Sequence, residues 1–450
     1  MKTLPALSLA LLLLSGCAAQ QYDIPTHDVL TLDQMEERYV IDRQWWTQYG
    51  DARLNDVVDM ALERNSDLAR SAISVNRALY RARQLGADLV PSFSADGSAS
   101  SRTQLDSGDA SRSFSASLGL NYELDLWGRL REAASAQVWE YEATKHDLDA
   151  TRLVLVNSVV NTYYSMAYTR QALALSRQDL GFYEELFRIV QDKYRAGKTS
   201  GLDPAQTEQS LLGQRDTVLS LEKRLADEEQ TLRDLLALRP EEALPVTETD
   251  LLSVAIPSID LDVPLEALGA RPDVQAAEAR LQSAFRDYEA SRKDLYPALS
   301  IGGTLGASST SAGDLFTSPF INGLVRLNLP FLDWNRVKWN VRISEASFED
   351  AKLTFSKSIT TALNEIDRYR RDVDISRQQF ENKKKTLEAN QKVETYRKAR
   401  YELGADELKD WLDALRSLNS SRLNVLNARY ALISSTNAVF QATGGRISPR

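Results

Sequence analysis

The chain has 450 residues, of which 43% are hydrophobic and 26% charged, and its formal net charge is −9. An acidic balance argues against a nucleic-acid partner, because phosphate binding requires a cationic face. One cysteine and two histidines exclude an intramolecular disulfide and leave too few side chains for most metal clusters and nucleophilic triads. We therefore expect no enzyme, no metal and no cofactor.

Residues 1–16 predict a cleaved lipoprotein signal peptide. Lys2 gives a positive start, and the apolar stretch 7–14 is too short to span a membrane and stay there. The sequence Leu-Ser-Gly-Cys ending at Cys17 matches the bacterial lipobox, so we expect that thiol to carry a covalent lipid, with palmitate, as an anchor in outer-membrane lipid. Ala18 favours sorting to the outer membrane. An ordinary signal peptide with an incidental cysteine is the alternative.

Self-similarity indicates a duplication with a period of about 207 residues. Four pairs of segments match in the same order: Asp67-Leu68 with Asp273-Val274, Asp88 to Pro91 with Asp294 to Pro297, Trp127-Gly128-Arg129 with Trp334-Asn335-Arg336, and Tyr194 to Gly197 with Tyr401 to Gly404. We therefore assign 61–238 and 271–444 to two repeats. Outside them lie an N-terminal segment 17–60, a linker 239–270 and a C-terminal tail 445–450.

Each repeat is expected to begin with a helix and then to form two strands. Phe114, Leu118 and Leu124 belong to an apolar series that alternates with small or polar residues, which is the period of a strand. The predicted strands are 91–102, 112–125, 297–309 and 321–331. Lengths near ten residues suit an outer-membrane barrel, but a half-buried sheet in water has the same alternation.

Four strands are too few to close a membrane barrel, since the smallest such barrels have about eight. An open sheet in lipid would leave the backbone groups of its edge strands without hydrogen-bond partners, at a cost of several kcal/mol each. If the strands enter the membrane, several copies of the chain must therefore share one barrel.

A long helix and a returning helix follow the strands in each repeat, at 130–196 and 203–238 and again at 336–403 and 406–443. No proline interrupts the two long helices. Apolar residues recur every seven positions, which predicts helices packed side by side with a left-handed supercoil. These residues are Val159, Met166, Leu173, Leu180, Phe187 and Tyr194, and then Ile359, Ile366, Val373, Phe380 and Leu387. A plain two-stranded coiled coil is the alternative.

The turns between long and returning helices are expected at Gly197 and Gly404, because glycine is the usual left-handed cap of a helix end. Acidic residues follow each turn and favour the start of a new helix. These two hairpin tips would form the end of the helical body away from the strands.

Several motifs along the mature chain resemble those of one protein family. They are Trp45-Trp46 with Gly50-Asp51, Leu54, Ala61-Leu62 and Asn65; Leu124 to Arg129; Arg271 to Val274 with Ala277-Glu278; and Leu329 to Asp333. Together they resemble the TolC-type outer-membrane factors, specifically the lipoprotein branch that serves resistance-nodulation-division efflux systems. The resemblance covers nearly the whole mature chain.

The resemblance implies an α+β membrane protein in which four strands per chain contribute to a trimeric twelve-stranded outer-membrane β-barrel, continued by a long coiled-coil α-helical barrel in the periplasm. The termini and the linker would form an equatorial belt. It also implies a passive exit duct for drugs or other small molecules. Its partners would be a periplasmic adaptor (membrane fusion) protein and an inner-membrane pump, of the resistance-nodulation-division type associated with multidrug resistance.

In this family, inward coiling of the helices and rings of acidic residues close the periplasmic tip. By their distance from the second tip glycine, Asp410 and Asp413 match the acidic ring. Tyr401 and Asp203 match a pair whose hydrogen bond helps to hold the tip shut. The arginine that some members place two residues after that glycine is replaced by Asp406. A carboxylate ring selects cations, whereas the alternative is that the two ring residues are ordinary helix-surface charges.

Two other functions are alternatives to the duct. A lipid-tethered periplasmic scaffold would have the same helices but strands that never enter the membrane. A hydrolase acting on the envelope would need a poised nucleophile or a metal cluster, and the sequence offers neither.

Overall fold

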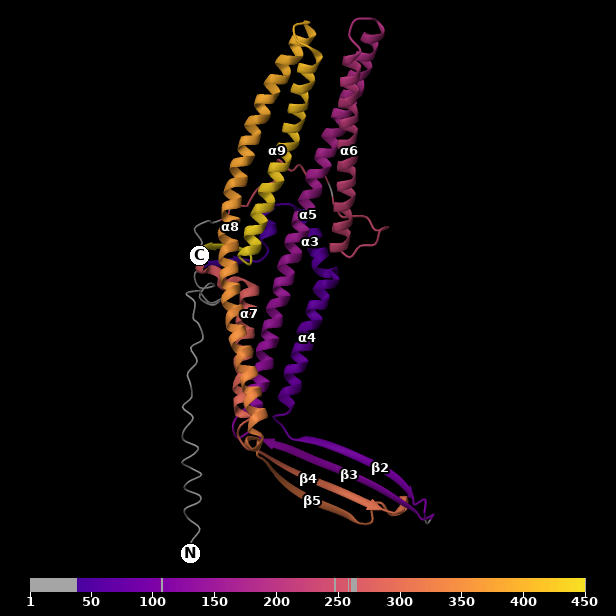
Figure 1. Cartoon of the computed structure of the whole chain (residues 1–450), viewed down its shortest axis with the longest axis vertical. Coiled ribbons are helices and arrows are strands. Elements are labelled where there is room, and N and C mark those ends of the chain that lie inside the picture. Colours follow the sequence, from indigo (N-terminus) through magenta and orange to yellow (C-terminus); the bar gives the residue numbers. More distant parts are fainter. Residues whose placement is uncertain (1–38, 107, 247, 258, 260–264, 450) are drawn as a thin grey trace.

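The computed structural model is an elongated body with a β-sheet at one end and long helices extending from it (Figure 1). The structure describes residues 39–106, 108–246, 248–257, 259 and 265–449. The predicted signal peptide 1–16, the lipid-bearing Cys17 and the first part of segment 17–60 lie outside the described residues.

Two long helices and a four-stranded sheet dominate the described chain. In chain order the elements are β1 (Tyr39–Asp42), η1 (Trp45–Tyr49), α3 (Ala52–Arg64), α4 (Ser66–Ala87), β2 (Ser92–Thr103), β3 (Ala110–Leu124), α5 (Arg129–Arg195), α6 (Leu202–Leu235), η2 (Leu265–Ala270), α7 (Pro272–Lys293), β4 (Ala298–Ser309), η3 (Ala312–Asp314), β5 (Pro319–Asn328), η4 (Pro330–Asp333), α8 (Trp334–Glu402), α9 (Leu408–Ala442) and β6 (Arg446–Pro449). The predicted fold class, a duplicated α+β chain with four strands in one sheet, is confirmed.

Differences from the predicted bounds have local causes. β5 ends at Asn328 and not at residue 331, because Pro330 has no N–H to donate to a strand ladder and begins the short helix η4. α6 ends at Leu235 and not at residue 238, because Ala237 adopts a left-handed conformation with φ 51°. The backbone N–H of Leu238 then donates to the carbonyl of Arg233 at 2.9 Å and closes the helix end.

The start of α5 shows how a strand passes into a long helix. Gly128 has φ 77°, which allows the sharp turn after the strand. The Asp125 side chain accepts hydrogen bonds from the backbone N–H groups of Leu130 at 3.0 Å and Arg131 at 3.1 Å. Two of the unpaired donors of the first helical turn are thereby satisfied.

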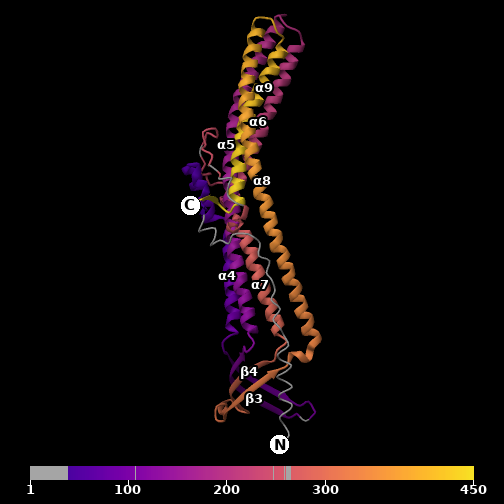
Figure 2. The same ribbon diagram turned by 90° about the vertical axis from the view of Figure 1, so that its left-hand side faces the viewer.

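The long helices α5 and α8 run without a break from the sheet to the hairpin tips (Figure 1). They contain 67 and 69 residues, so each is about 100 Å long at about 1.5 Å per residue. Near the sheet α4 and α7 lie beside them, and beyond the middle of the body α6 and α9 take their place (Figures 1 and 2).

The sevenfold apolar spacing is confirmed over most of both long helices but is wrong at Tyr194, which is 51% exposed. In α5, Leu180 and Phe187 are partly buried and pack against a tip core that contains Tyr183, Leu186 and Val190. In the α8 series the first three residues are buried and the last two partly buried. A straight helix drifts by about 20° per heptad from a strict sevenfold repeat, so a register fixed at the middle does not reach the tip.

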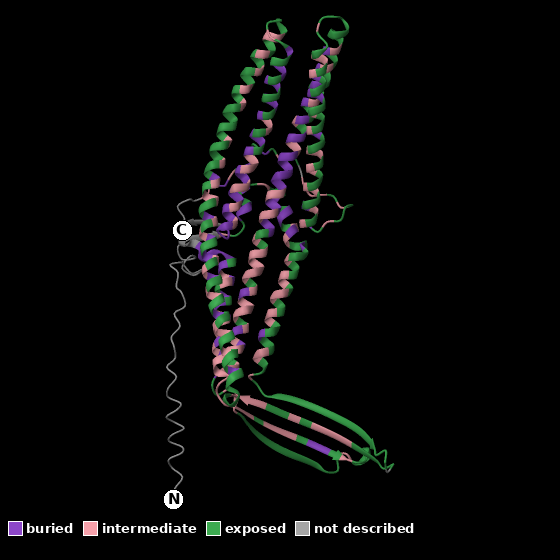
Figure 3. Ribbon diagram, in the orientation of Figure 1, coloured by how far each residue is buried: buried purple, intermediate pink, exposed green. Residues whose placement is uncertain are grey.

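The largest hydrophobic core lies at the middle of the body, where purple residues gather in Figure 3. Trp45 from η1 is fully buried, and its ring centroid lies 5.1 Å from that of Phe440 in α9. Leu251 and Val254 of the linker belong to the same core. The first and last described strands, β1 and β6, pair antiparallel beside it. The structure thus joins the N-terminal segment, the linker and the C-terminus around the long helices.

Among the described residues, none of the helices is both long enough and apolar enough to pass through a membrane.

Candidate functional site: the sheet and the hairpin tips

The sheet has the antiparallel order β2-β3-β4-β5, and its register places the apolar series on one face. Leu118 pairs with Ala95 on one side and Leu305 on the other, and Leu305 pairs with Ile321. Paired residues share a face of an antiparallel sheet. The resulting apolar face contains Phe93, Ala95, Phe114, Ala116, Leu118, Leu120, Tyr122, Leu124, Leu299, Ile301, Leu305, Val325 and Leu327, among others.

The opposite face of the sheet is mainly small and polar. Ser98 and Ser115 lie opposite each other, with their hydroxyl oxygens 2.8 Å apart. Phe320 is an exception, and its ring covers Gly306, where a Cβ atom would come within 2.6 Å of a ring carbon. The face as a whole is suited to contact with water, whereas its apolar counterpart is not.

Both the apolar face and the two edges of the sheet are uncovered within one chain. Ile321 is 81% exposed and Val325 70% exposed, and β2 and β5 are exposed along their whole length (Figure 3). These edge strands have a neighbour on one side only, so a row of backbone donors and acceptors is open on the other. A sheet of this kind is incomplete as a single copy.

The two hairpin tips are built alike. Gly197 has φ 65° and Gly404 has φ 73°. After each of them the chain makes the same backbone bond, from Lys198 N–H to the Lys193 carbonyl and from Ala405 N–H to the Arg400 carbonyl, at 2.9 and 2.8 Å. This is the Schellman arrangement, in which a left-handed glycine ends a helix.

The predicted hydrogen bond between Tyr401 and Asp203 is not formed between these residues of the described chain. The Tyr401 hydroxyl accepts from the Lys193 amine at 3.0 Å, and its ring stacks on Trp411 with centroids 5.2 Å apart. The Asp203 carboxylate, in the first turn of α6, accepts instead from the Thr199 hydroxyl. Tyr401 thus bonds to the first hairpin through Lys193, whereas Asp203 bonds within its own hairpin.

The two predicted ring residues are exposed on α9, and the structure brings them to one helix surface three residues apart. Asp413 accepts from Arg416 at 3.3 Å. The same guanidinium donates to the Ser210 hydroxyl at 2.6 Å and so links α9 to α6. The Asp410 carboxylate has no hydrogen bond or ion pair with another described side chain. It is therefore available to a neighbouring copy or to ions, whereas the Asp413 carboxylate already has Arg416 as a partner.

Asp406 has a role that the sequence analysis missed. Its side chain is only 6% exposed and accepts from Arg397 at 2.9 Å and from Arg400 at 2.7 Å. The two arginines are three residues apart and so share a face of α8. That spacing, with an acid just past the turn, was the signal available in the sequence.

The hydrogen bond from Arg397, with the second from Arg400, lowers the pKa of the Asp406 carboxyl below its usual value. A lowered pKa in the folded chain means that the contact stabilises the turn fully above the ordinary carboxyl pKa. The contribution is lost as the pH falls through the lower, folded value. Near neutral pH this contact therefore stabilises the turn between α8 and α9.

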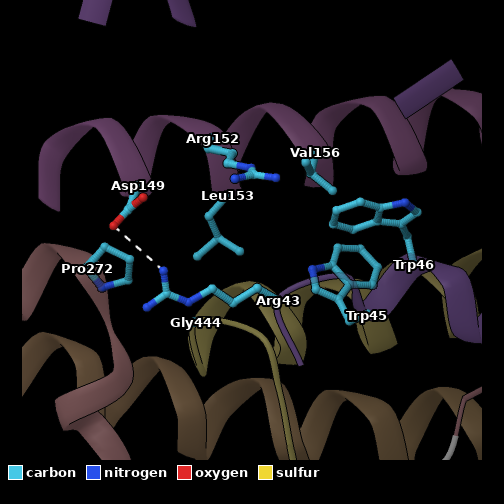
Figure 4. A pocket seen from close by; sticks show the side chains of 9 residues that line it. All are labelled: Arg43, Trp45, Trp46, Asp149, Arg152, Leu153, Val156, Pro272 and Gly444. Atoms are coloured by element: carbon cyan, nitrogen blue, oxygen red, sulfur yellow. Dashed lines mark ion pairs between the residues drawn. The ribbon is translucent and has the colours of Figure 1, made fainter. Parts of the chain in front are cut away.

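A small pocket lies at the middle of the body, between η1 and α5 (Figure 4). Arg43 and Asp149 form an ion pair of 3.8 Å across it, with Trp45 and Trp46 at one end and Pro272 at the other. The buried indole N–H of Trp45 has no hydrogen-bond partner among the described residues. The pocket marks where the N-terminal segment is fixed against the long helix.

Within the ranges that the structure describes, no group of three or more histidine, cysteine or acidic side chains is arranged to hold a metal ion.

Comparison with known families gives two matches within the chain. The family model described as "Outer membrane efflux protein" matches residues 57–238 and again residues 263–445. The two matches correspond to the two repeats, and together they cover most of the chain.

Individual relatives are similar along nearly the full length. The chain is 37% identical to the toxin and drug export protein A of Aggregatibacter actinomycetemcomitans, over 97% of this chain and 96% of that protein. It is 29% identical to the pyoverdine export outer membrane protein of Pseudomonas aeruginosa, over 90% of this chain and 87% of that protein. Its fold is similar to that of the Campylobacter jejuni outer membrane channel, with a TM-score of 0.82 and 22% identity over 96% of this chain and 91% of that one.

Proposed function

This chain belongs to the outer membrane efflux protein family, and from that premise we propose that three copies close the open sheet into one twelve-stranded barrel. The protein is an outer-membrane channel that extends into the periplasm, and its family is one of transport channels and not of enzymes. Members of the family work with periplasmic adaptors and inner-membrane pumps. The observation that carries the proposal is a single-layered sheet with one apolar face and two open edges.

The two edges of one protomer can pair with each other, both in the sheet and in the helical body. β2 follows α4 directly, and β5 leads into α8, so each edge strand continues into an edge helix (Figure 1). β2 runs away from the helices and β5 returns toward them, so β2 of one copy can pair antiparallel with β5 of the next. Contacts between different edges of identical copies generate a closed ring when the rotation from one copy to the next closes on itself, as a rotation of one third of a turn does. A scaffold held in the periplasm would have no reason to expose this apolar face.

The cargo is expected to be small molecules driven by the pump, since the duct offers no energy source of its own. The relatives named above export toxins and drugs or pyoverdine. By similarity we place this duct in a drug-exporting system whose pump is of the resistance-nodulation-division type.

We propose that the mature chain carries a lipid on Cys17. The lipobox supports this proposal, and an anchor of more than one acyl chain holds stably in a bilayer. Cells fed radiolabelled palmitate should label the wild-type chain, and Cys17→Ser should lose all of that label. Labelling that persists in Cys17→Ser would refute lipidation at this thiol.

We also propose that Asp410 and Asp413 form the acidic ring at the periplasmic tip. Both are exposed on the same helix surface, and symmetry would bring three copies of each around one aperture. In planar bilayers the purified trimer should conduct. Asp410→Ala with Asp413→Ala should raise the conductance or weaken block by divalent cations several-fold, because a carboxylate ring concentrates cations.

Exposed acids elsewhere supply the control for the gate experiment. Asp56→Ala with Asp59→Ala, on α3 near the middle of the body, should leave both conductance and block unchanged. If conductance and block are the same in the tip variant as in the wild type, the ring assignment is wrong. If no variant conducts at all, the channel proposal itself fails.

A further inference from the structure

The duplication allows the two junctions between strand and long helix to be compared position by position. Trp127, Arg129 and Arg131 of the first junction correspond to Trp334, Arg336 and Lys338 of the second. One residue further on, Glu132 corresponds to Trp339. The two repeats have therefore kept the tryptophan and the cations but exchanged a carboxylate for a second tryptophan.

At the first junction the tryptophan is held by its own chain. The Trp127 indole N–H donates to the Pro297 carbonyl at 2.9 Å, and its ring stacks on Tyr296 with centroids 5.0 Å apart. Glu132 is only 19% exposed and accepts from Lys293 at 2.8 Å. The first junction is thus packed against α7.

The cations of the first junction are also neutralised within the chain. Arg129 pairs with Glu123 at 2.8 Å, and Arg131 pairs with Asp125 at 3.1 Å. The first junction therefore has few unpaired charges that could bind another molecule.

The second junction is exposed nearly all round the helix. Trp334 is 54% exposed, Trp339 61% and Leu332 76%. Of the three cations between residues 331 and 343, Arg336 pairs with Asp333 at 2.9 Å and Arg342 with Glu345 at 2.6 Å. Lys338 has no carboxylate partner among the described residues, and its amine lies 5.5 Å from the centroid of the Trp339 ring. This surface combines large aromatic rings with one positive charge, on Lys338, that no described carboxylate compensates.

We propose that the surface formed by residues 331–343 binds an anionic phospholipid headgroup at the periplasmic face of the outer membrane. The proposal rests on the proposed function, because it requires the sheet to lie in the bilayer. β5 ends at Asn328, six residues before Trp334, so the junction lies at the level where the apolar face stops. Tryptophan favours this level of a bilayer, and lysine or arginine beside it attracts anionic lipid.

The alternative occupant of this surface is the neighbouring copy, since α8 is an edge helix of the protomer (Figure 2). Charge favours the lipid. Along α4, which would be the facing edge, the apolar residues Ile73 and Tyr80 are accompanied by several arginines. Among residues 77–88, at the end of α4 nearer the sheet, three arginines outnumber the single carboxylate Asp88, so the facing edge has a net positive charge that would repel Lys338. A phosphate group would supply the missing negative charge.

The test uses the full-length trimer in nanodiscs made from equal amounts of phosphatidylglycerol and phosphatidylcholine. Retained lipids are counted by native mass spectrometry after release. The wild-type trimer should retain phosphatidylglycerol in preference, and Lys338→Gln should reduce that preference about fivefold, since one basic residue near the surface contributes ~1 kcal/mol. The matched control is Arg131→Gln, the equivalent position of the first repeat, and it should leave the preference unchanged.

The following results would overturn the proposal. An equal preference for phosphatidylglycerol in Lys338→Gln and wild type would show that Lys338 does not bind the headgroup. Competition by inorganic phosphate at the same concentration as lipid would assign it to free phosphate. Faster dissociation of Lys338→Gln trimers in lipid-free detergent, with unchanged lipid preference, would assign the surface to the neighbouring copy. Trimers that insert but show no preference contradict this inference alone, whereas failure of the wild type to form trimers contradicts the proposed function as well.

Discussion

Replacing Leu118 with arginine is expected to abolish assembly of the channel in the outer membrane. Leu118 lies near the middle of β3, on the apolar face between Ala95 and Leu305, and is 51% exposed in one chain. In a closed barrel that exposed surface faces lipid, where an arginine near the bilayer midplane costs ~2–4 kcal/mol. Three copies triple this cost, which then becomes comparable to the whole stability of a typical domain, ~5–15 kcal/mol. The measurement is the amount of trimer in isolated outer membranes, seen on gels without heating.

The neighbouring residue supplies the control for this experiment. Ser117 points to the polar face and pairs with Asp96, so Ser117→Arg should assemble normally. The two variants have the same new side chain, one residue apart in the same strand. Normal assembly of Leu118→Arg, or equal loss in both variants, would show that the apolar face does not contact lipid.

Trp45→Ala is expected to cause the largest loss of stability in the helical body, about 3–5 kcal/mol per chain. Trp45 is fully buried, and its ring centroid lies 5.1 Å from that of Phe440 and 6.1 Å from that of Trp46. It belongs to the core that joins both termini to the long helices. Because its N–H has no partner among the described residues, the loss would arise from packing and not from a broken hydrogen bond. Urea unfolding of the purified trimer, followed by circular dichroism, measures the effect.

A more conservative substitution at the same position tests whether lost packing causes the loss of stability. Trp45→Phe keeps an aromatic ring in the core and should lose less than Trp45→Ala. Tyr430→Phe removes only a hydroxyl from a residue at the margin of the same core and should change the unfolding midpoint little. An unchanged midpoint in Trp45→Ala would mean that this core contributes little to the stability of the body.

The strands and long helices could be predicted because their signals are local. A period of two in Phe114 to Leu124 identifies β3, and the lack of proline permits α5 and α8. The order of strands and the pairing of β1 with β6 could not be read from the sequence, because these contacts join distant residues. The pairing of Asp42 with Arg446, for example, has no local signal.

The hairpin tips were harder to predict than the sheet. The glycines were identified from the chemistry of left-handed caps, which depends on one residue. The hydrogen-bond partners of Tyr401 and Asp203 depend instead on which of several polar side chains lies nearest, and here Lys193 and Thr199 do. The spacing of Arg397 and Arg400 hints at a shared partner, but the structure is needed to show that Asp406, just past the end of α8, binds both.

The change of partner helices at the middle of the body has a mechanical consequence. On the membrane side, α7 contacts both α5 and α8, whereas on the far side α5 pairs with α6 and α8 with α9, and these two hairpins contact each other through α5 and α9. The core around Trp45 lies at this changeover. Moving the two hairpins apart would therefore break the contacts between α5 and α9 near the tips, whereas the contacts of α7 with both long helices could stay in place.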